Sequence, residues 1–271
     1  MTSLAVADPR TDRGIDLTAP IARTNPVAKL VASTIVALGL LISVDVVTAG
    51  VALGLEVLAL PWCGVRPKAL LRRGFIIVVG GVPAGVATAV FGEDSGSVLA
   101  ALGPVSVTSG SLLAGVAITL RIFAIGLPGV VLLSTTDPTD LADALGQIAR
   151  LPARFTLAAL AGLRLFGLMA QEWRTLSLAR RARGIGDTGP VGAVRTALGQ
   201  VFALLVLAIR RATVLATAME SRGFGVNRPR TWARPSRLHR RDAVLVLGAL
   251  VVTALAITAG VRLGTWNPLL G

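Results

Sequence analysis

Two short motifs that place an arginine directly before a glycine recur thirty-nine residues apart. Residues 182–186 read Ala-Arg-Gly-Ile-Gly, and residues 221–225 read Ser-Arg-Gly-Phe-Gly. A guanidinium group keeps its charge when it is buried and forms strong paired hydrogen bonds with carboxylates. Glycine just past the end of a helix adopts a left-handed cap, which stops the helix and leaves the arginine at its tip. These motifs are therefore typical of helix ends, and we interpret them as binding sites for an acidic groove on another protein.

Three aspartates, Asp137, Asp140 and Asp143, have a spacing similar to that with which membrane prenyltransferases hold magnesium and diphosphate. Such enzymes need a second acidic cluster facing the first, and we find none in the sequence. The start of a helix explains the same residues, with Asp137 as the cap, Pro138 in the first turn and Asp140 near the positive end of the dipole. We therefore predict a short helix that ends near Arg150, and a magnesium-dependent prenyltransferase is an alternative.

Other chemistry of this chain is restricted by its composition. There is no G-x-x-x-x-G-K-[ST] motif, and neither Lys29 nor Lys68 lies in a glycine-rich loop, so we do not expect the chain to hydrolyse ATP. A single cysteine, Cys63, and a single histidine, His239, exclude an internal disulfide and sites with several cysteines or paired histidines. We predict no catalytic residue and no metal or cofactor bound by the chain itself.

The elements that position these residues are predicted to be membrane helices. Of the 271 residues, 54% are hydrophobic and 15% charged, and the mean hydropathy is +0.75. So few charges do not cover the surface of a soluble protein of this size. Five apolar runs each have about the length of one membrane crossing, near 20 residues: they are Val27–Val44, Val46–Val65, Phe75–Phe91, Ser111–Leu133 and Ala243–Val261. We predict an all-α polytopic membrane protein with about five transmembrane helices.

The basic residues predict the orientation of these helices. Four of the 27 lie before or at the start of the first span, four between the second and third, and seventeen between Ser134 and Arg241. All these clusters fall on one side, which the positive-inside rule identifies as the cytoplasm. We therefore expect a multi-pass membrane protein with a cytoplasmic N-terminus. Its predicted regions are a flexible tail (1–24), four transmembrane helices (25–133), a cytoplasmic region of coupling helices (134–241), and a last helix with a short external tail (242–271).

Residues inside the predicted spans suggest how the helices pack. Glu56 and Arg121 are costly against lipid, so each should face other helices, and Arg121 should bind helix carbonyls or an acid such as Glu56. Glycine pairs at positions 50 and 54 and at positions 81 and 85 predict close helix packing.

The cytoplasmic region contains seventeen arginines and six acidic residues, a net charge of +11, and yet is strongly apolar between the charges. Two long amphipathic helices are predicted over 154–183 and 191–222, each ending in one of the Arg-Gly motifs. The first has a stripe of Leu165, Met169, Trp173 and Leu176, and the second a face of Val201, Leu204, Ala208, Leu215 and Met219. As an alternative, Val201 begins a sixth span, but Arg210 and Arg211 would then lie near the bilayer centre, at a cost of about 3 kcal/mol or more.

The sequence resembles the transmembrane T component of energy-coupling factor (ECF) transporters, which import vitamins and metal ions into bacteria. The resemblance covers most of residues 25–262. It is carried by Asn25–Leu30, Leu120-Arg121, Thr135–Pro138, Leu163-Arg164 with Glu172, and the two Arg-Gly helix ends.

In that family, the T component is a scaffold whose coupling helices dock into two ABC-type ATPase subunits and which also holds a substrate-binding membrane subunit, the S component. The resemblance implies that ATP and magnesium are used by the partners and not by this chain. It implies that the ATPase-docking residues are Ala182, Arg183, Gly184, Ser221, Arg222 and Gly223, where Ser221 replaces the alanine of the family motif. It further implies structural or coupling roles for Arg121, Asp137, Arg164 and Glu172.

Two other functions are weighed against this one. A self-sufficient permease needs a polar binding pocket near the middle of the bilayer, and the predicted spans offer only Glu56 and Arg121. Nucleic-acid binding by the basic region lacks interleaved aromatic residues, and the membrane topology already explains the positive charge. We therefore expect the lipid bilayer and other transporter subunits as partners, and no nucleic acid.

Overall fold

The computed structural model describes residues 16, 18–43, 45–92, 95–102, 105–184, 189–224, 232 and 234–265. The chain divides into two compact units. The first, here called the bundle unit, comprises Met1–Ala144 and Ser236–Gly271, and the second, the hairpin unit, comprises Leu145–Pro235.

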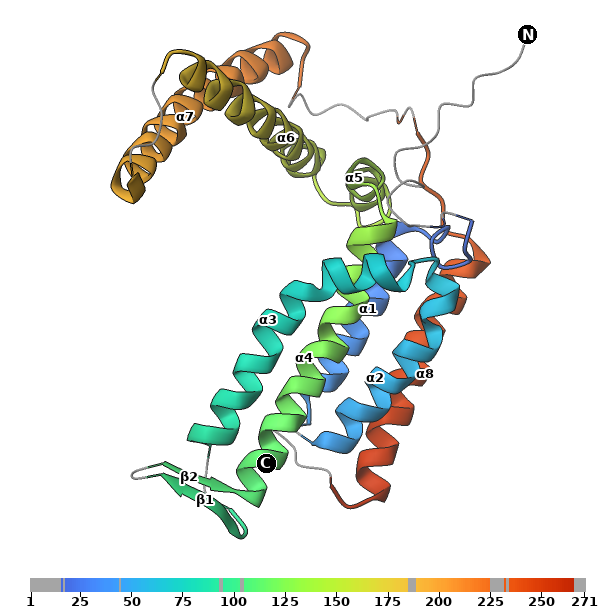
Figure 1. Ribbon diagram of the computed structural model, residues 1–271. Coiled ribbons are helices and arrows are strands. Elements are labelled where there is room, and N and C mark those ends of the chain that lie inside the picture. The colour runs from blue at the N-terminus through green and yellow to red at the C-terminus, as the bar shows by residue number, and fades with distance from the viewer. Residues whose placement is uncertain are drawn as a thin grey trace, which may run out of the picture. The chain divides into compact units, whose positions relative to one another are not determined.

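The bundle unit is built from five long helices, which correspond to the five predicted apolar runs (Figure 1). They are α1 (Pro26–Leu41), α2 (Val46–Cys63), α3 (Pro67–Phe91), α4 (Ser109–Thr135) and α8 (Arg240–Arg262). Helix α4 packs against α1, α2 and α3, and α8 packs against α1 and α2. The centre of the bundle is a small apolar cluster of Val36, Leu40, Ala52, Ala124 and Ala256, each at most 5% exposed.

Two segments of the bundle unit differ from the sequence-based expectation. Helix α3 begins at Pro67, eight residues before the predicted apolar run at Phe75, so the basic residues Lys68, Arg72 and Arg73 lie in its first turns. Proline is well suited to the first helical position, and arginine and lysine are good helix formers. The segment between α3 and α4, for which no helix or strand was predicted, contains a pair of antiparallel strands, β1 (Val98–Leu102) and β2 (Val105–Thr108). Its valines favour extended backbone.

The turn between α1 and α2 is held by Asp45, the one residue that separates the first two apolar runs. One carboxylate oxygen of Asp45 accepts a hydrogen bond from Ser43 Oγ (2.6 Å), and the other accepts bonds from the backbone N–H and the hydroxyl of Thr48 (both 2.8 Å). Burial acts to raise the pKa of Asp45, but these hydrogen bonds outweigh it and hold the pKa below its ordinary value. Thr265, after α8, donates a further bond to Asp45, so this turn also fixes the end of α8.

Among the residues that the structure describes, six helices are long and apolar enough to cross a membrane. They include α2, α3, α4 and α8, but also the two long helices of the hairpin unit, while α1, with 16 residues, is shorter than the usual crossing of about 20. By length and composition alone, the number of candidate membrane spans is therefore six and differs from the predicted five. The all-α polytopic architecture itself is confirmed.

The hairpin unit contains α6 (Ala153–Ala182) and α7 (Gly189–Ser221), close to the two predicted coupling helices. The shorter α5 (Pro138–Gln147) precedes them and ends before the expected Arg150. Gln200 and Ser177 hydrogen-bond across the pair, and Arg180 Nη1 donates to the carbonyl of Thr196 (3.0 Å). Since residues later in α6 contact residues earlier in α7, the two helices run antiparallel.

The packing faces of this helix pair are predicted well for α6 and in part for α7. The predicted stripe of α6, from Leu165 to Leu176, is half-buried, while Phe166 beside it is 77% exposed. On α7, Leu204, Ala208 and Met219 are half-buried as expected. Val201 and Leu215 are instead exposed, and beside Val201 it is the polar Gln200 that occupies the buried position next to Ser177.

The glycine pairs of the spans differ in how closely neighbouring helices approach them. A Cβ atom at Gly85 would lie 2.6 Å from the carbonyl oxygen of Gly115 in α4 and would also overlap the Thr119 hydroxyl. A Cβ atom at Gly81 would lie 3.1 Å from side-chain atoms of α4, whereas at Gly54 it would meet nothing within 4 Å. The predicted close packing is therefore found at Gly81 and Gly85 but not at Gly54.

We expect Gly85→Leu to lower the thermal stability of the purified chain, because backbone atoms of α4 cannot move aside as a flexible side chain can. Overpacking of this kind costs about 1–3 kcal/mol or more. The matched control is Gly54→Leu, which adds the same side chain to a membrane helix where space is open. Thermal unfolding in detergent measures both, and equal melting temperatures for the two variants would show that α3 and α4 do not pack as described.

Candidate functional site

Both Arg-Gly motifs lie at helix ends, where the predicted left-handed glycine caps are confirmed. Gly184 has φ +71° and follows α6, and Gly223 has φ +75° and follows α7. At the second motif, the N–H groups of Gly223 and Phe224 donate to the carbonyls of Glu220 (2.9 Å) and Met219 (3.0 Å). This pair of bonds is the Schellman arrangement, which ends a helix abruptly. At the first motif, Gly184 N–H donates to Arg181 O (3.0 Å), the corresponding bond.

The caps leave the motif arginines free at the helix tips. Arg183 and Arg222 are exposed, as are Ala182 and Ser221 before them. Within the described part of the chain, neither guanidinium forms a hydrogen bond or ion pair. In electrostatic terms, each tip is a cation fixed beside a rigid backbone turn, which suits it to bind a carboxylate.

The two motifs are not brought together by the fold. Arg183 follows α6, close in sequence to the beginning of α7, whereas Arg222 follows the other end of α7. With 33 residues, α7 is about 50 Å long. The arrangement therefore offers two separate binding points at opposite ends of one helix.

Glu172 and Arg211 join α6 to α7. Arg211 Nη2 lies 2.6 Å from Glu172 Oε1, and both side chains are about one-third exposed. Glu172, singled out by the resemblance, thus has a structural contact, which the sequence alone did not pair with Arg211. Arg164 is exposed on α6 and forms no ion pair among the residues described.

Asp137 is placed as its predicted role requires. Its carboxylate accepts a hydrogen bond from Thr139 N–H (2.7 Å), and its carbonyl accepts one from Leu141 N–H (2.9 Å), at the start of α5. Within the residues that the structure describes, no three acidic, histidine or cysteine side chains are grouped as a metal site. Helix capping therefore accounts for Asp137.

Arg121 and Glu56 both lie inside apolar helices, α4 and α2, and do not pair with each other. Arg121 Nη2 and both carboxylate oxygens of Glu56 are buried without a hydrogen-bond partner in the described part of the chain. Of the two kinds of partner expected for Arg121, the pairing with Glu56 is therefore not formed.

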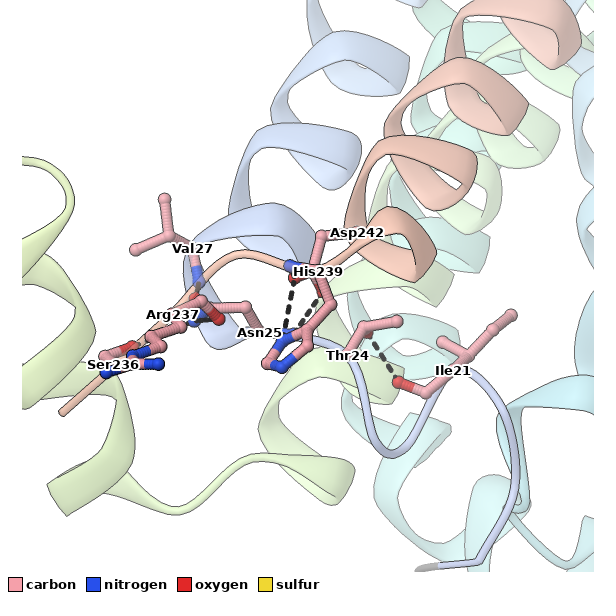
Figure 2. A network of polar contacts seen from close by, with 8 residues as sticks. All are labelled: Ile21, Thr24, Asn25, Val27, Ser236, Arg237, His239 and Asp242. Atoms are coloured by element: carbon pink, nitrogen blue, oxygen red, sulfur yellow. Dashed lines mark hydrogen bonds and ion pairs between the residues drawn. The ribbon is translucent and has the colours of Figure 1, made fainter. Parts of the chain in front are cut away.

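A polar network at the beginning of α1 connects it to the segment that leads from the hairpin unit into α8 (Figure 2). The backbone N–H of Asn25 donates to Asp242 Oδ1 (2.6 Å), and its side-chain amide donates to Ser236 Oγ (2.9 Å). Asp242 is 3% exposed and also accepts a bond from His239 N–H (2.6 Å). Asn25 caps α1 at the same time, since its side-chain oxygen accepts from Val27 N–H (2.9 Å).

Lys29, one turn into α1, connects it to the segment that leads into the hairpin unit. The Lys29 ammonium donates to the carbonyl (3.3 Å) and hydroxyl (3.0 Å) of Thr135, the last residue of α4, and to the hydroxyl of Thr136 (3.5 Å). A fourth bond reaches the carbonyl of Ala22 (2.9 Å). Lys29 is 5% exposed, so these bonds are shielded from water.

The first turn of α1 thus binds both chain segments that connect the bundle unit with the hairpin unit. Sequence reasoning singled out Asn25–Leu30 as part of a family pattern but assigned no role to Asn25, Lys29 or Asp242. The only signal in the sequence was a single lysine, Lys29, inside an apolar run. The contacts that reveal its role and that of Asn25, with Thr135 and Asp242, join residues more than one hundred positions apart.

Comparison with known proteins identifies relatives over most of the chain. A family model described as a cobalt transport protein, CbiQ, matches residues 18–231. An energy-coupling factor transporter transmembrane protein, EcfT, of Limosilactobacillus fermentum is 28% identical over 213 residues, which are 74% of this chain and 75% of that protein. The EcfT proteins of Exiguobacterium sibiricum and Bacillus subtilis are each 30% identical, over 56% and 59% of this chain and 61% and 64% of their own lengths.

Proposed function

Because the chain belongs to the CbiQ family and is a multi-pass transmembrane component of an energy-coupling factor transporter, we propose that it couples two ABC-type ATPase subunits to a substrate-binding S component. In this proposal, Arg183 and Arg222 each dock into an acidic groove of one ATPase subunit. The observation that carries it is the pair of exposed arginines, without a polar partner among the described residues, on glycine-capped tips at opposite ends of α7. Two separated tips suit two separate ATPase subunits.

The proposed orientation places α6 and α7 on the cytoplasmic side of the bacterial inner membrane, together with the N-terminus. The charge pattern supports this, because Glu172, Arg210 and Arg211 lie in the middle of these helices, where a bilayer would penalise them. The exposed apolar side chains of α6 and α7, such as Phe166 (77%) and Phe202 (68%), are then available to cover a membrane partner.

Energy is proposed to pass from the ATPase subunits to the bundle unit mechanically. ATP and magnesium are used by the partners, whose closure moves the tips bearing Arg183 and Arg222. The chain enters the hairpin unit after α4 and leaves it before α8, and both of these segments are held on α1 by Lys29 and Asn25. Movement of α6 and α7 is thereby passed to α1 and its neighbours, and the S component delivers a vitamin or metal ion.

The proposed function is tested by purifying the affinity-tagged chain from membranes of its native host in a mild detergent. We expect two P-loop ATPase polypeptides and one small hydrophobic membrane protein to be retained, and the complex to hydrolyse ATP while the chain alone does not. Mass spectrometry identifies the retained proteins. Recovery of the chain by itself, with substrate uptake by vesicles that contain only this chain, would instead indicate a self-sufficient permease.

A further inference from the structure

A cavity of about 550 Å³ lies in the bundle unit between α1, α2, α4 and α8. Its wall is made almost entirely of apolar side chains, among them Val36, Leu60, Val131 and Val252. Of the described residues that border it, four carry charged side chains: Lys29, Glu56, Arg240 and Arg241.

Of the charged side chains in the cavity wall, those at the first turn of α8 are available to bind a ligand. Both carboxylate oxygens of Glu56 are covered by protein atoms, and the Lys29 ammonium already binds carbonyl and hydroxyl oxygens of α4 and of the segment before α1. Arg240 and Arg241 are exposed, and neither side chain has a hydrogen-bond or ion-pair partner in the part of the chain described. The cavity thus combines a hydrocarbon-like interior with two free guanidinium groups at the first turn of α8.

The cavity also has the length of one membrane leaflet. Along α8 it is lined by residues at spacings of three and four, from Arg240 through Val244 and Gly248 to Val252. Twelve residues of helix rise span about 18 Å, and half of a hydrocarbon core of about 30 Å is about 15 Å. An occupant whose charged group lies at Arg240 therefore extends to about the middle of the bilayer.

We propose that this cavity binds an anionic phospholipid, with an acyl chain against α1, α2, α4 and α8 and the phosphate held by Arg240 and Arg241. The lipid comes from the leaflet on the side where α8 begins, which is cytoplasmic in the orientation proposed above. Basic residues attract anionic lipids at the membrane surface, whereas zwitterionic headgroups carry no net charge for them to bind. Since Val36 and Ala249 lie in the cavity wall and also belong to or contact the central apolar cluster, the lipid completes the packing of the bundle.

The test uses the full chain in nanodiscs that contain phosphatidylcholine with a minor share of phosphatidylglycerol, followed by mild extraction and quantification of retained lipid by mass spectrometry. We expect phosphatidylglycerol to be enriched on the wild-type chain. Arg240→Ser with Arg241→Ser should reduce that enrichment about 25-fold, since each arginine near an anionic surface contributes about fivefold. Arg262→Ser removes one arginine from the other end of α8 and, as the control for position, should leave the enrichment unchanged.

A second variant tests the cavity itself. A Cβ atom at Gly248 meets nothing within 4 Å, so Gly248→Leu fills the cavity without displacing a neighbour, and we expect retention of phosphatidylglycerol to be lost. Gly80→Leu adds the same side chain to α3 in open space outside the cavity and should retain the lipid. Unchanged retention by Gly248→Leu, or retention of the two lipids by the wild-type chain in the same proportions as in the nanodisc, would overturn the proposal. Because lipid retention is measured without ATPase subunits, neither result depends on whether Arg183 and Arg222 dock them.

Discussion

Replacing both Arg183 and Arg222 by glutamate is expected to abolish co-purification of the ATPase subunits with this chain. A hydrogen bond between charged groups contributes about 1.5–3 kcal/mol, so the loss of two weakens binding by about 3–6 kcal/mol. This corresponds to roughly a hundredfold to ten-thousandfold, and the new carboxylates add repulsion against an acidic groove. Substrate uptake should fall together with the binding of the ATPase subunits. The chain itself should still fold, because both side chains are exposed and the helix caps depend on Gly184 and Gly223.

The matched control for this variant changes the same net charge elsewhere on the same helices. Arg174 on α6 and Arg195 on α7 are exposed and form no ion pair in the described residues, so Arg174→Glu with Arg195→Glu should retain the ATPase subunits. Single variants at Arg183 and Arg222 should each lose part of the binding. Their effects should combine additively, because the two sites are far apart. Full retention of the ATPase subunits by the double variant would remove the docking role.

Lys29→Met is expected to uncouple ATP hydrolysis from uptake in a complex that still assembles. Methionine fills a similar volume but leaves the carbonyl of Ala22 and the end of α4 without their donor, and the segment after α4 is no longer held on α1. Coupling free energies are typically about 1–3 kcal/mol, so substrate transported per ATP hydrolysed should fall by about 5- to 150-fold. Measurement of both rates in proteoliposomes gives this ratio directly.

The other lysine of the chain provides the control for Lys29. Lys68 is exposed at the start of α3, so Lys68→Met should leave the ratio of uptake to hydrolysis unchanged. Lys29→Arg restores a donor at the same place and should recover part of the coupling. If Lys29→Met assembles with its partners and transports as much substrate per ATP as the wild type, the first turn of α1 does not transmit the movement.

The features that follow from local sequence were predictable. Apolar runs of the right length gave the helices of the bundle unit, and Asp45, Asp137, Gly184 and Gly223 carry capping or turn chemistry that depends on close neighbours in the chain. The start of α3 was placed too late because hydropathy marks where a helix becomes apolar, while Pro67 marks where it begins. Composition alone does not separate the spans from the other long helices, because α6 and α7 meet the same criteria of length and hydropathy as the helices of the bundle unit.

The parts that sequence did not predict depend on contacts between distant residues. Asn25 and Asp242 are separated by 217 positions, and Lys29 and Thr135 by 106, so their pairing requires the bundle to be formed. The buried position of Gln200 likewise depends on Ser177 in the facing helix, which local sequence does not show, and the face of α7 was misjudged at the neighbouring Val201 and also at Leu215. Periodicity identifies an apolar face but does not show which neighbour it meets.

Cysteine accessibility in oriented membrane vesicles tests most directly whether the two motifs lie in the cytoplasm and bind the ATPase subunits. With Cys63 replaced by serine, single cysteines at the exposed positions Ala182 and Ser221 are treated with a membrane-impermeant maleimide, and a cysteine at exposed Leu263 reports the opposite side. We expect positions 182 and 221 to react only in inside-out vesicles and to be protected by added ATPase subunits, and position 263 to react only in right-side-out vesicles. Labelling of position 182 or 221 from the external side, or labelling that ATPase subunits do not reduce, would contradict the proposed coupling role.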